Sequence, residues 1–261
     1  MAHVVFDRRG GGRSLLLLPG AGADARLWDP LVTLLEPWFE LHVAEIAGFA
    51  GRPREPGRLW PRVEEEVAEY VSALESAPVV VAHSWAGLLG WSLSARGAPI
   101  AAGVVIDSLP ALGARIARDP ETLRRAVAER VAKLRAVAPA ELAGHLEASV
   151  ARMTRSVEQA RRMLAVAARS DPTTLAEAME AAWLADLRPA LIEGTTPVTL
   201  VLPGDEHLPP AAKASKHTVA YGQVAALPHH RVVEVPQSSH YVMLDQPNAL
   251  AAIVHDVAQG V

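Results

Sequence analysis

A serine with small neighbours is the first feature of this sequence that could carry out chemistry. Ser84 stands in the stretch AHSWAG (82–87), after the apolar, β-branched run 79–81 and before a helix-like segment. A nucleophile at such a strand–turn–helix junction needs a strained backbone that lifts its hydroxyl clear of the sheet. Small residues are then required two positions before and after it, and Ala82 and Ala86 meet this requirement. The stretch is typical of a nucleophilic serine, and equally of an ordinary serine in a strand–helix loop.

A histidine and two aspartates stand where other predicted strands end. His240 follows the last of these strands, and Asp107 and Asp205 each end an earlier one. A serine hydroxyl becomes a good nucleophile when a histidine takes its proton, and a carboxylate orients that histidine. Parallel strands end at the same edge of a sheet, so we expect these side chains to meet there. The chain order serine, acid, histidine indicates nucleophilic acyl transfer.

Strand and helix patterns alternate over both ends of the chain, which predicts an α/β protein with a mostly parallel sheet covered on both faces. The glycine run in 8–13 predicts a hairpin turn. The predicted strands are 3–6, 14–18, 41–44, 79–81, 103–106, 198–202 and 231–235, and the predicted helices are 28–35, 61–76, 88–96, 213–226 and 248–259.

A helical stretch without strand patterns interrupts this alternation. Residues 120–185 are rich in Ala, Arg, Glu and Leu, with breaks near Pro139, Thr154 and Pro172 that predict four short helices. We therefore predict a core formed by 1–110 and 190–261, with a helical cap (lid) inserted at 111–189. Met153, Met163, Met179 and Trp183 could line an apolar acyl pocket under this cap or simply pack against the core.

Three stretches resemble the α/β-hydrolase superfamily, and the resemblance covers most of the chain: LLLLPGAG (15–22), AHSWAG (82–87) and SSHYVMLDQP (238–247). The sequence also resembles members of that superfamily with a helical cap. The resemblance implies that Ser84 is the nucleophile and His240 the general base and acid. It further implies that the backbone amides of Ala21 and Trp85 form the oxyanion hole.

The carboxylate that would orient His240 is the point where the chain departs most from the family pattern. The family usually places it as G-x-x-D after the penultimate strand, where this chain has His207. Asp107 is favoured, because some members use that position and Asp205 would need a loop rearrangement to reach His240. Asp205 remains the alternative, and otherwise it would be a solvated turn residue. Two milder departures are Pro19, where a histidine is usual, and Ser238-Ser239, where glycines are usual.

Composition excludes several classes of function. The chain has 261 residues, half of them hydrophobic, a net charge of −4 and no cysteine. Disulfides, thiolate catalysis and cysteine-bound metals are therefore excluded, and nothing indicates a nucleic-acid or membrane partner. Neither a signal peptide nor a membrane span is indicated, so we expect a cytoplasmic protein. No metal or other cofactor is expected, and the sequence does not predict the oligomeric state.

The sequence therefore favours the hypothesis that the protein is a serine hydrolase, which cleaves a small or medium carboxylic ester through an acyl-enzyme. Within the same superfamily, lyases acting on C–C bonds and non-hydrolytic ligand receptors are alternatives. A dinucleotide-dependent oxidoreductase is a further rival, because residues 20–25 fit G-x-G-x-x-A and Glu45 ends the next strand. Pro30 argues against it, since it falls where the phosphate-binding helix should be continuous.

Overall fold

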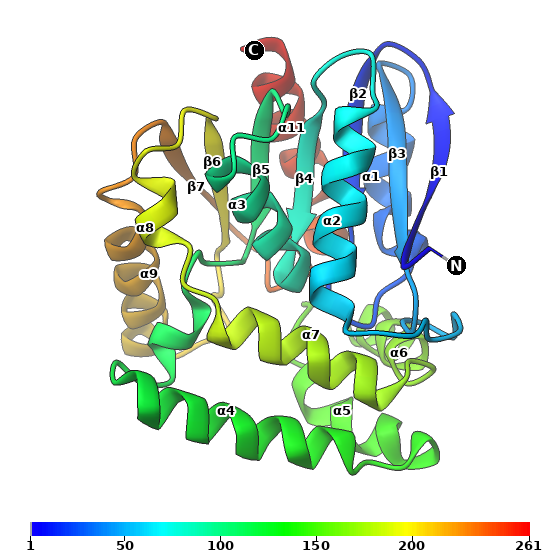
Figure 1. Ribbon diagram of the computed structural model, residues 1–261, viewed down its shortest axis with the longest axis vertical. Coiled ribbons are helices and arrows are strands. Elements are labelled where there is room, and N and C mark those ends of the chain that lie inside the picture. The colour runs from blue at the N-terminus through cyan, green and yellow to red at the C-terminus, as the bar shows by residue number, and fades with distance from the viewer. Residues whose placement is uncertain (1) are drawn as a thin grey trace.

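A seven-stranded sheet forms the centre of the structure, a computed structural model that describes residues 2–261 (Figure 1). The first strand in the spatial order is antiparallel to its neighbour, and all other neighbours are parallel. The predicted α/β class and mostly parallel sheet are confirmed. In spatial order the strands are β1 (Val4–Gly10), β3 (Phe39–Ile46), β2 (Arg13–Leu18), β4 (Val79–His83), β5 (Ala102–Ile106), β6 (Val198–Pro203) and β7 (His230–Val235).

The central strands are unbroken apolar runs because helices cover both faces of the sheet. In β2, Leu15 and Leu17 pack into the hydrophobic core on one face, while Leu16 and Leu18 pack into the core on the other. All of these side chains are fully buried. The outer strand β7 is more exposed and carries charged residues, so its pattern is less apolar.

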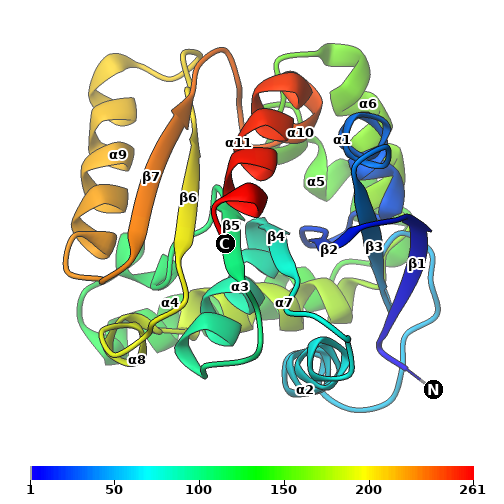
Figure 2. The same cartoon turned by 90° about the horizontal axis from the view of Figure 1, so that it is seen from above.

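Helices form a layer on each face of the sheet (Figures 1 and 2). Helices α1 and α11 pack on one face, and α2 and α3 pack on the other. No helix among residues 2–261 is both long and apolar enough to cross a membrane. The helices in these layers are α1 (Asp29–Leu35), α2 (Leu59–Ser72), α3 (Gly87–Ala95), α8 (Arg188–Leu191), α9 (Pro210–Val224), α10 (Val242–Asp245) and α11 (Pro247–Gln259).

The chain between β5 and β6 is helical, and its helices lie below the carboxyl edge of the sheet in Figure 1. Aspartates cap the first and last of these helices: Asp119 accepts from the Thr122 amide and Asp171 from the Thr174 amide, both at 2.7 Å. A proline follows each cap at the first helical position, where its missing N–H costs nothing. The four predicted helices are confirmed as α4 (Pro120–Arg135), α5 (Leu142–Val150), α6 (Val157–Ala167) and α7 (Pro172–Leu184).

The predicted hairpin at 8–13 is wrong. The strands on either side of it, β1 and β2, are not neighbours in the sheet, because β3 lies between them. The glycines serve this crossing instead. Gly10 has φ +76°, and a Cβ there would collide with the Phe39 carbonyl oxygen. A side chain at this position is therefore excluded by the close approach of β1 to the start of β3.

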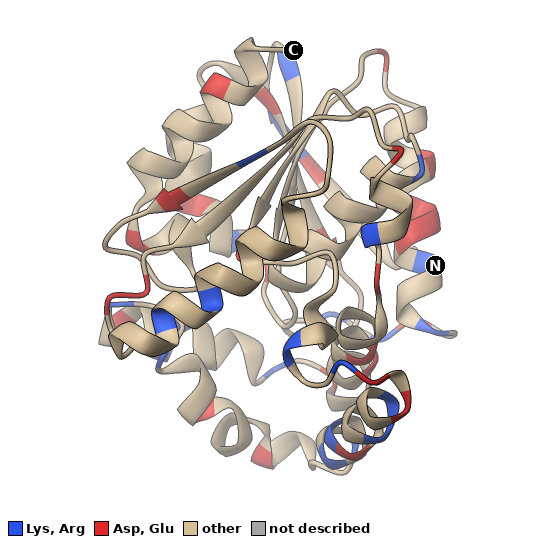
Figure 3. Cartoon of the chain, turned by 90° about the vertical axis from the view of Figure 1, so that its left-hand side faces the viewer, with Lys and Arg blue, Asp and Glu red and all other residues tan. Residues whose placement is uncertain are grey.

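Acidic and basic residues are interspersed over the helices, as Figure 3 shows. Neither sign of charge dominates the segments in this view, in keeping with the small net charge of −4. Arg124, Arg125, Arg161 and Arg162 lie on exposed faces of α4 and α6.

Candidate active site

Ser84 occupies a sharp turn at the carboxyl end of β4. The strand ends at His83, Ser84 has φ +55°, and a single 3-10 turn, η2 (Ser84–Ala86), leads into α3. Positive φ is rare for a residue with a side chain and indicates that the surrounding structure enforces the turn. Gly20 leaves room for it, because a Cβ there would lie 3.0 Å from the Ser84 Cβ and 2.8 Å from His83 Nδ1.

Gly87 allows α3 to lie close to β5. A Cβ on Gly87 would collide with the Ser108 side chain and would lie 3.0 Å from Val105 Cγ1. We expect Gly87→Ala to lower the free energy of unfolding by about 1–3 kcal/mol through overpacking. Urea denaturation measures this loss. Gly144→Ala on α5 is the matched control, because no atom lies within 4 Å of its added Cβ. A Gly87→Ala protein as stable as the control would contradict the close packing.

Strand register brings Asp107 beside Ser84. His83 pairs with Ile106 between β4 and β5, so the next residue of each strand extends past the same edge of the sheet. The Asp107 amide donates to the Val201 carbonyl on β6 at 2.9 Å, and Asp107 itself has φ +44°. His240 comes to the same edge in the loop that follows β7.

His240 and Asp107 are in direct contact. His240 Nδ1 lies 2.7 Å from Asp107 Oδ2, and the two side chains are 22% and 12% exposed. Burial opposes the charge on Asp107, but Lys216 and His240 outweigh it, so the pKa of Asp107 is held well below its usual value. An ionised carboxylate only accepts hydrogen bonds, so Nδ1 of His240 carries a proton. Nε2 is then the ring nitrogen available for proton transfer.

His83 contacts the backbone of His240. Its Nε2 lies 3.0 Å from the His240 carbonyl oxygen, and the two rings have centroids 4.5 Å apart. Burial, with the nearby His240, lowers the pKa of His83 well below its usual value, so the ring is neutral. Nε2 must donate to the carbonyl, which leaves Nδ1 without a proton. Through this hydrogen bond His83 holds the backbone that carries the His240 ring.

Ser84, His240 and Asp107 line one cavity of about 280 Å³, together with Gly20 and Ala21. Apolar side chains from the helical segment 111–189 form its opposite wall, including Leu134, Leu146, Val150, Met153 and Met179. A larger groove of about 530 Å³ runs between Ala111, Arg124 and Gln223. That groove contains none of the three polar residues, so the smaller cavity is the candidate active site.

The methionines and the tryptophan of the helical segment divide between the two expected roles. Met153 and Met179 line the cavity. Met163 instead packs in the main core, and Trp183 packs beside α4, where Arg130 lies 5.8 Å from its ring centroid.

The structure places both residues of the predicted oxyanion hole near Ser84. Ala21 lines the cavity from the loop after β2, and Trp85 follows Ser84 directly. The Trp85 ring turns into the core, where it makes edge-to-face contacts with Phe49 and Trp60 at 5.3 and 6.1 Å between centroids. Its ring is therefore not part of the cavity wall, and only its backbone amide can serve the site.

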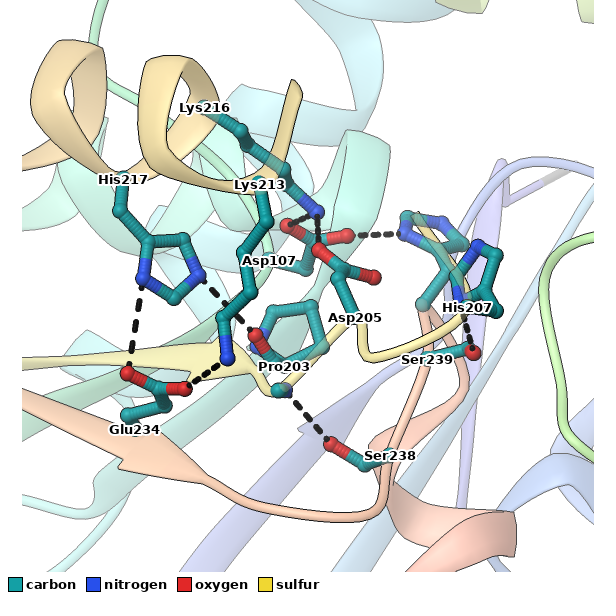
Figure 4. A network of polar contacts seen from close by, with 12 residues as sticks. Asp107, Pro203, Asp205, His207, Lys213, Lys216, His217, Glu234, Ser238 and Ser239 are labelled. Atoms are coloured by element: carbon teal, nitrogen blue, oxygen red, sulfur yellow. Dashed lines mark hydrogen bonds and ion pairs between the residues drawn. The ribbon is translucent and has the colours of Figure 1, made fainter. Parts of the chain in front are cut away.

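Asp205 is not the solvated turn residue that the sequence analysis allowed. It is 3% exposed and has φ +50°, and its carboxylate lies 2.5 Å from Lys216 Nζ (Figure 4). Lys216 also lies 2.9 Å from Asp107 Oδ1. The sequence alone indicates no role for Lys216. Its position on the helix that follows Asp205 is the one signal that could have pointed to it.

The adjacent histidines at 229–230 and the pair Glu206-His207 could indicate a metal site in the sequence, but they do not form one. His230 Nδ1 donates to the Leu227 carbonyl oxygen, and His207 Nδ1 lies 3.1 Å from Ser239 Oγ. Within residues 2–261, His, Asp and Glu side chains do not gather in any group of three that could hold a metal ion.

The sheet order and the helices on both of its faces define a doubly covered α/β protein with polar residues gathered at the carboxyl edge of the sheet. The model of the alpha/beta hydrolase family matches residues 15–253, so the chain belongs to this family. Solved structures show the same fold. An enol-lactonase from Burkholderia xenovorans LB400 is 21% identical with a TM-score of 0.77, covering 98% of this chain and 96% of that one. A hydrolase from Pseudomonas aeruginosa PA01 is 19% identical with a TM-score of 0.79, covering 98% and 94%.

Two curated relatives match part of the chain. The pimeloyl-[acyl-carrier protein] methyl ester esterase of Vibrio vulnificus (strain YJ016) is 34% identical over 88 residues, which are 34% of this chain and 30% of that protein. The protein of the same name from Sodalis glossinidius (strain morsitans) is 33% identical over 95 residues, 36% of each. The match therefore spans about a third of each relative.

Proposed function

We propose that this protein hydrolyses carboxylic esters with a small or medium acyl group, using Ser84, His240 and Asp107 as a catalytic triad. The observation that carries the proposal is the contact between His240 Nδ1 and Asp107, at 2.7 Å, in the cavity that Ser84 also lines. The named activity of the partial relatives, methyl ester esterase, supports an ester as substrate. A cavity of about 280 Å³ lies at the small end of ligand sites, which supports a substrate of limited size.

In the proposed reaction, Nε2 of His240 takes the proton of Ser84 as Oγ attacks the ester carbonyl carbon. Negative charge develops on the carbonyl oxygen, and the amides of Ala21 and Trp85 would stabilise it. Removing one such donor typically costs about 3 kcal/mol. The tetrahedral intermediate collapses, the alcohol leaves with the proton from Nε2, and an acyl-enzyme remains. Water then attacks the acyl carbon with His240 again as base, which releases the carboxylic acid and restores Ser84.

The helical segment 111–189 would act as a cap over this site. This proposal is supported by Leu134, Leu146 and Met179, which come from three helices of the segment and form the apolar wall of the cavity opposite Ser84. Such a wall would bind an acyl chain and exclude water from the charged transition state.

The test is labelling with a fluorophosphonate, followed by a panel of p-nitrophenyl esters from acetate to palmitate. We expect the label on the peptide that contains Ser84, and turnover that is highest for short and medium chains. A folded protein that takes up no label would overturn the activated serine. Labelling without turnover of any ester would overturn hydrolysis in favour of a lyase or a ligand receptor. A rise in melting temperature with NAD(H) or FAD would favour the oxidoreductase instead.

A further inference from the structure

A largely buried chain of charges runs from Asp107 through Lys216 to Asp205 (Figure 4). Lys216 Nζ lies 2.9 Å from Asp107 Oδ1 and 2.5 Å from Asp205 Oδ2. Asp107 therefore uses one oxygen for His240 and the other for Lys216. The side chains of Lys216 and Asp205 are 14% and 4% exposed, so solvent screens these contacts weakly.

Three separate elements build this arrangement. Asp107 ends β5, Asp205 follows β6, and Lys216 lies on α9. The Asp205 amide donates to the Ser238 carbonyl at 2.9 Å, which ties its loop to the loop that carries His240. Asp205 also adopts φ +50°, a region that a side chain rarely enters. A buried charge in a strained conformation is costly, so it calls for a role that an apolar residue could not fill.

We propose that Lys216 and Asp205 are positioning residues that act through Asp107 to set the pH range in which His240 can serve as a base. Lys216 fixes the rotation of the Asp107 carboxylate and weakens its field at His240. Asp205 returns a negative charge, so the three groups together carry the −1 of a lone aspartate. The charges of Asp107 and Asp205 outweigh burial and raise the pKa of Lys216, which is thus charged at neutral pH.

The other groups that face His240 do not compete for this role. His83, from β4, is neutral as described, and burial raises the pKa of the adjacent Tyr241 to about 12. Arg115 also lines the cavity. His207 and Asp245 contact the neighbouring residue, Ser239. All of these groups are unchanged in the variants below, so differences between variants report the Lys216–Asp205 pair.

The direction of each effect follows from charge. His240 must be neutral to act as a base, so activity falls at low pH as its ring takes up a proton. Lys216→Met leaves more negative charge beside the ring, favours the imidazolium, and moves this acid limb of the pH profile to higher pH. Asp205→Asn leaves Lys216 unbalanced and moves the limb to lower pH. Each shift should be ~0.5–1 pH unit, and the double variant should lie close to the wild type.

The experiment measures kcat/KM against pH for p-nitrophenyl butyrate with the wild type, the two single variants and the double variant. Lys213→Met is the matched control, because Lys213 lies on the same helix and pairs with Glu234 at 2.7 Å, outside the chain that reaches His240. It should not move the acid limb. The double variant removes both charges together, so it and Asp205→Asn still test the proposal if Lys216→Met does not fold.

The proposal for Lys216 and Asp205 rests on the proposed esterase function only where it is tested by kcat/KM. A titration of the His240 ring by NMR in histidine-labelled protein needs no turnover, and its midpoint should shift in the same opposite directions. Single variants that lower the melting temperature but leave both the limb and the NMR midpoint in place would overturn it. Shifts of the same sign in both single variants would overturn it as well. An inactive wild type with opposite NMR shifts would overturn the esterase proposal alone.

Discussion

Ser84→Ala should lower kcat for ester hydrolysis by about 10⁶-fold and abolish fluorophosphonate labelling. The reason is that the acyl-enzyme route needs the Ser84 oxygen, and removing a triad nucleophile typically costs this much. Water attack aided only by the remaining groups would supply the residual rate. Stopped-assay kinetics with p-nitrophenyl butyrate measure the loss, and rates are normalised to the protein concentration from absorbance, because active-site titration needs the Ser84 oxygen that the variant lacks.

The fold should survive this change. Ser84 has φ +55°, and alanine pays a similar cost in this region, so the free energy of unfolding should change by less than about 1 kcal/mol. Ser72→Ala is the control, because this exposed serine on α2 bonds only to the Ala68 carbonyl at 2.8 Å. It should keep full activity and full labelling. A Ser84→Ala protein that retained more than a small fraction of the activity would place the nucleophile elsewhere.

The helices and strands could be predicted because a sheet buried on both faces requires strands that are apolar at every position. Strands such as β2 and β4 are uninterrupted apolar runs, and the helices of the segment 111–189 start at Asp-Pro pairs or after breaks that the composition shows. For most helices and strands, the predicted ends differ from the observed ends by a few residues. In contrast, the pairing of β1 with β3 was missed. These two strands are separated in the sequence by β2. The glycine-rich turn after β1 does not indicate which strand β1 pairs with.

The candidate site could be predicted where it depends on strand ends. Ser84, Asp107 and His240 each follow a strand directly or within a short loop, and the parallel sheet alone brings such positions to one edge. The environment of Asp205 could not be predicted in this way. It depends on a lysine from α9 that reaches back toward the sheet, and helical periodicity does not show which of the two lysines of this helix points inward. The burial of the Trp85 ring was likewise outside what the local sequence indicates.

Asp107→Asn should lower kcat by about 10³–10⁴-fold, whereas Asp205→Asn should lower it by less than about tenfold at neutral pH. Asp107 contacts the His240 ring at 2.7 Å, and an amide there would favour the wrong tautomer and fail to stabilise the imidazolium. Asp205 contacts Lys216 at 2.5 Å, and its effect reaches His240 only through Lys216 and Asp107. The two substitutions are chemically the same, so each is the control for the other.

The measurement is kcat at saturating p-nitrophenyl butyrate, together with the melting temperature of each variant. Both variants disturb the same buried ion network, so a general loss of packing would lower the two activities alike. A large difference in kcat at similar stability would assign the triad acid to Asp107. The reverse order, with Asp205→Asn inactive and Asp107→Asn active, would mean that the loop after β6 rearranges in the working enzyme. Asp205 would then orient His240 from the position that the family ordinarily uses.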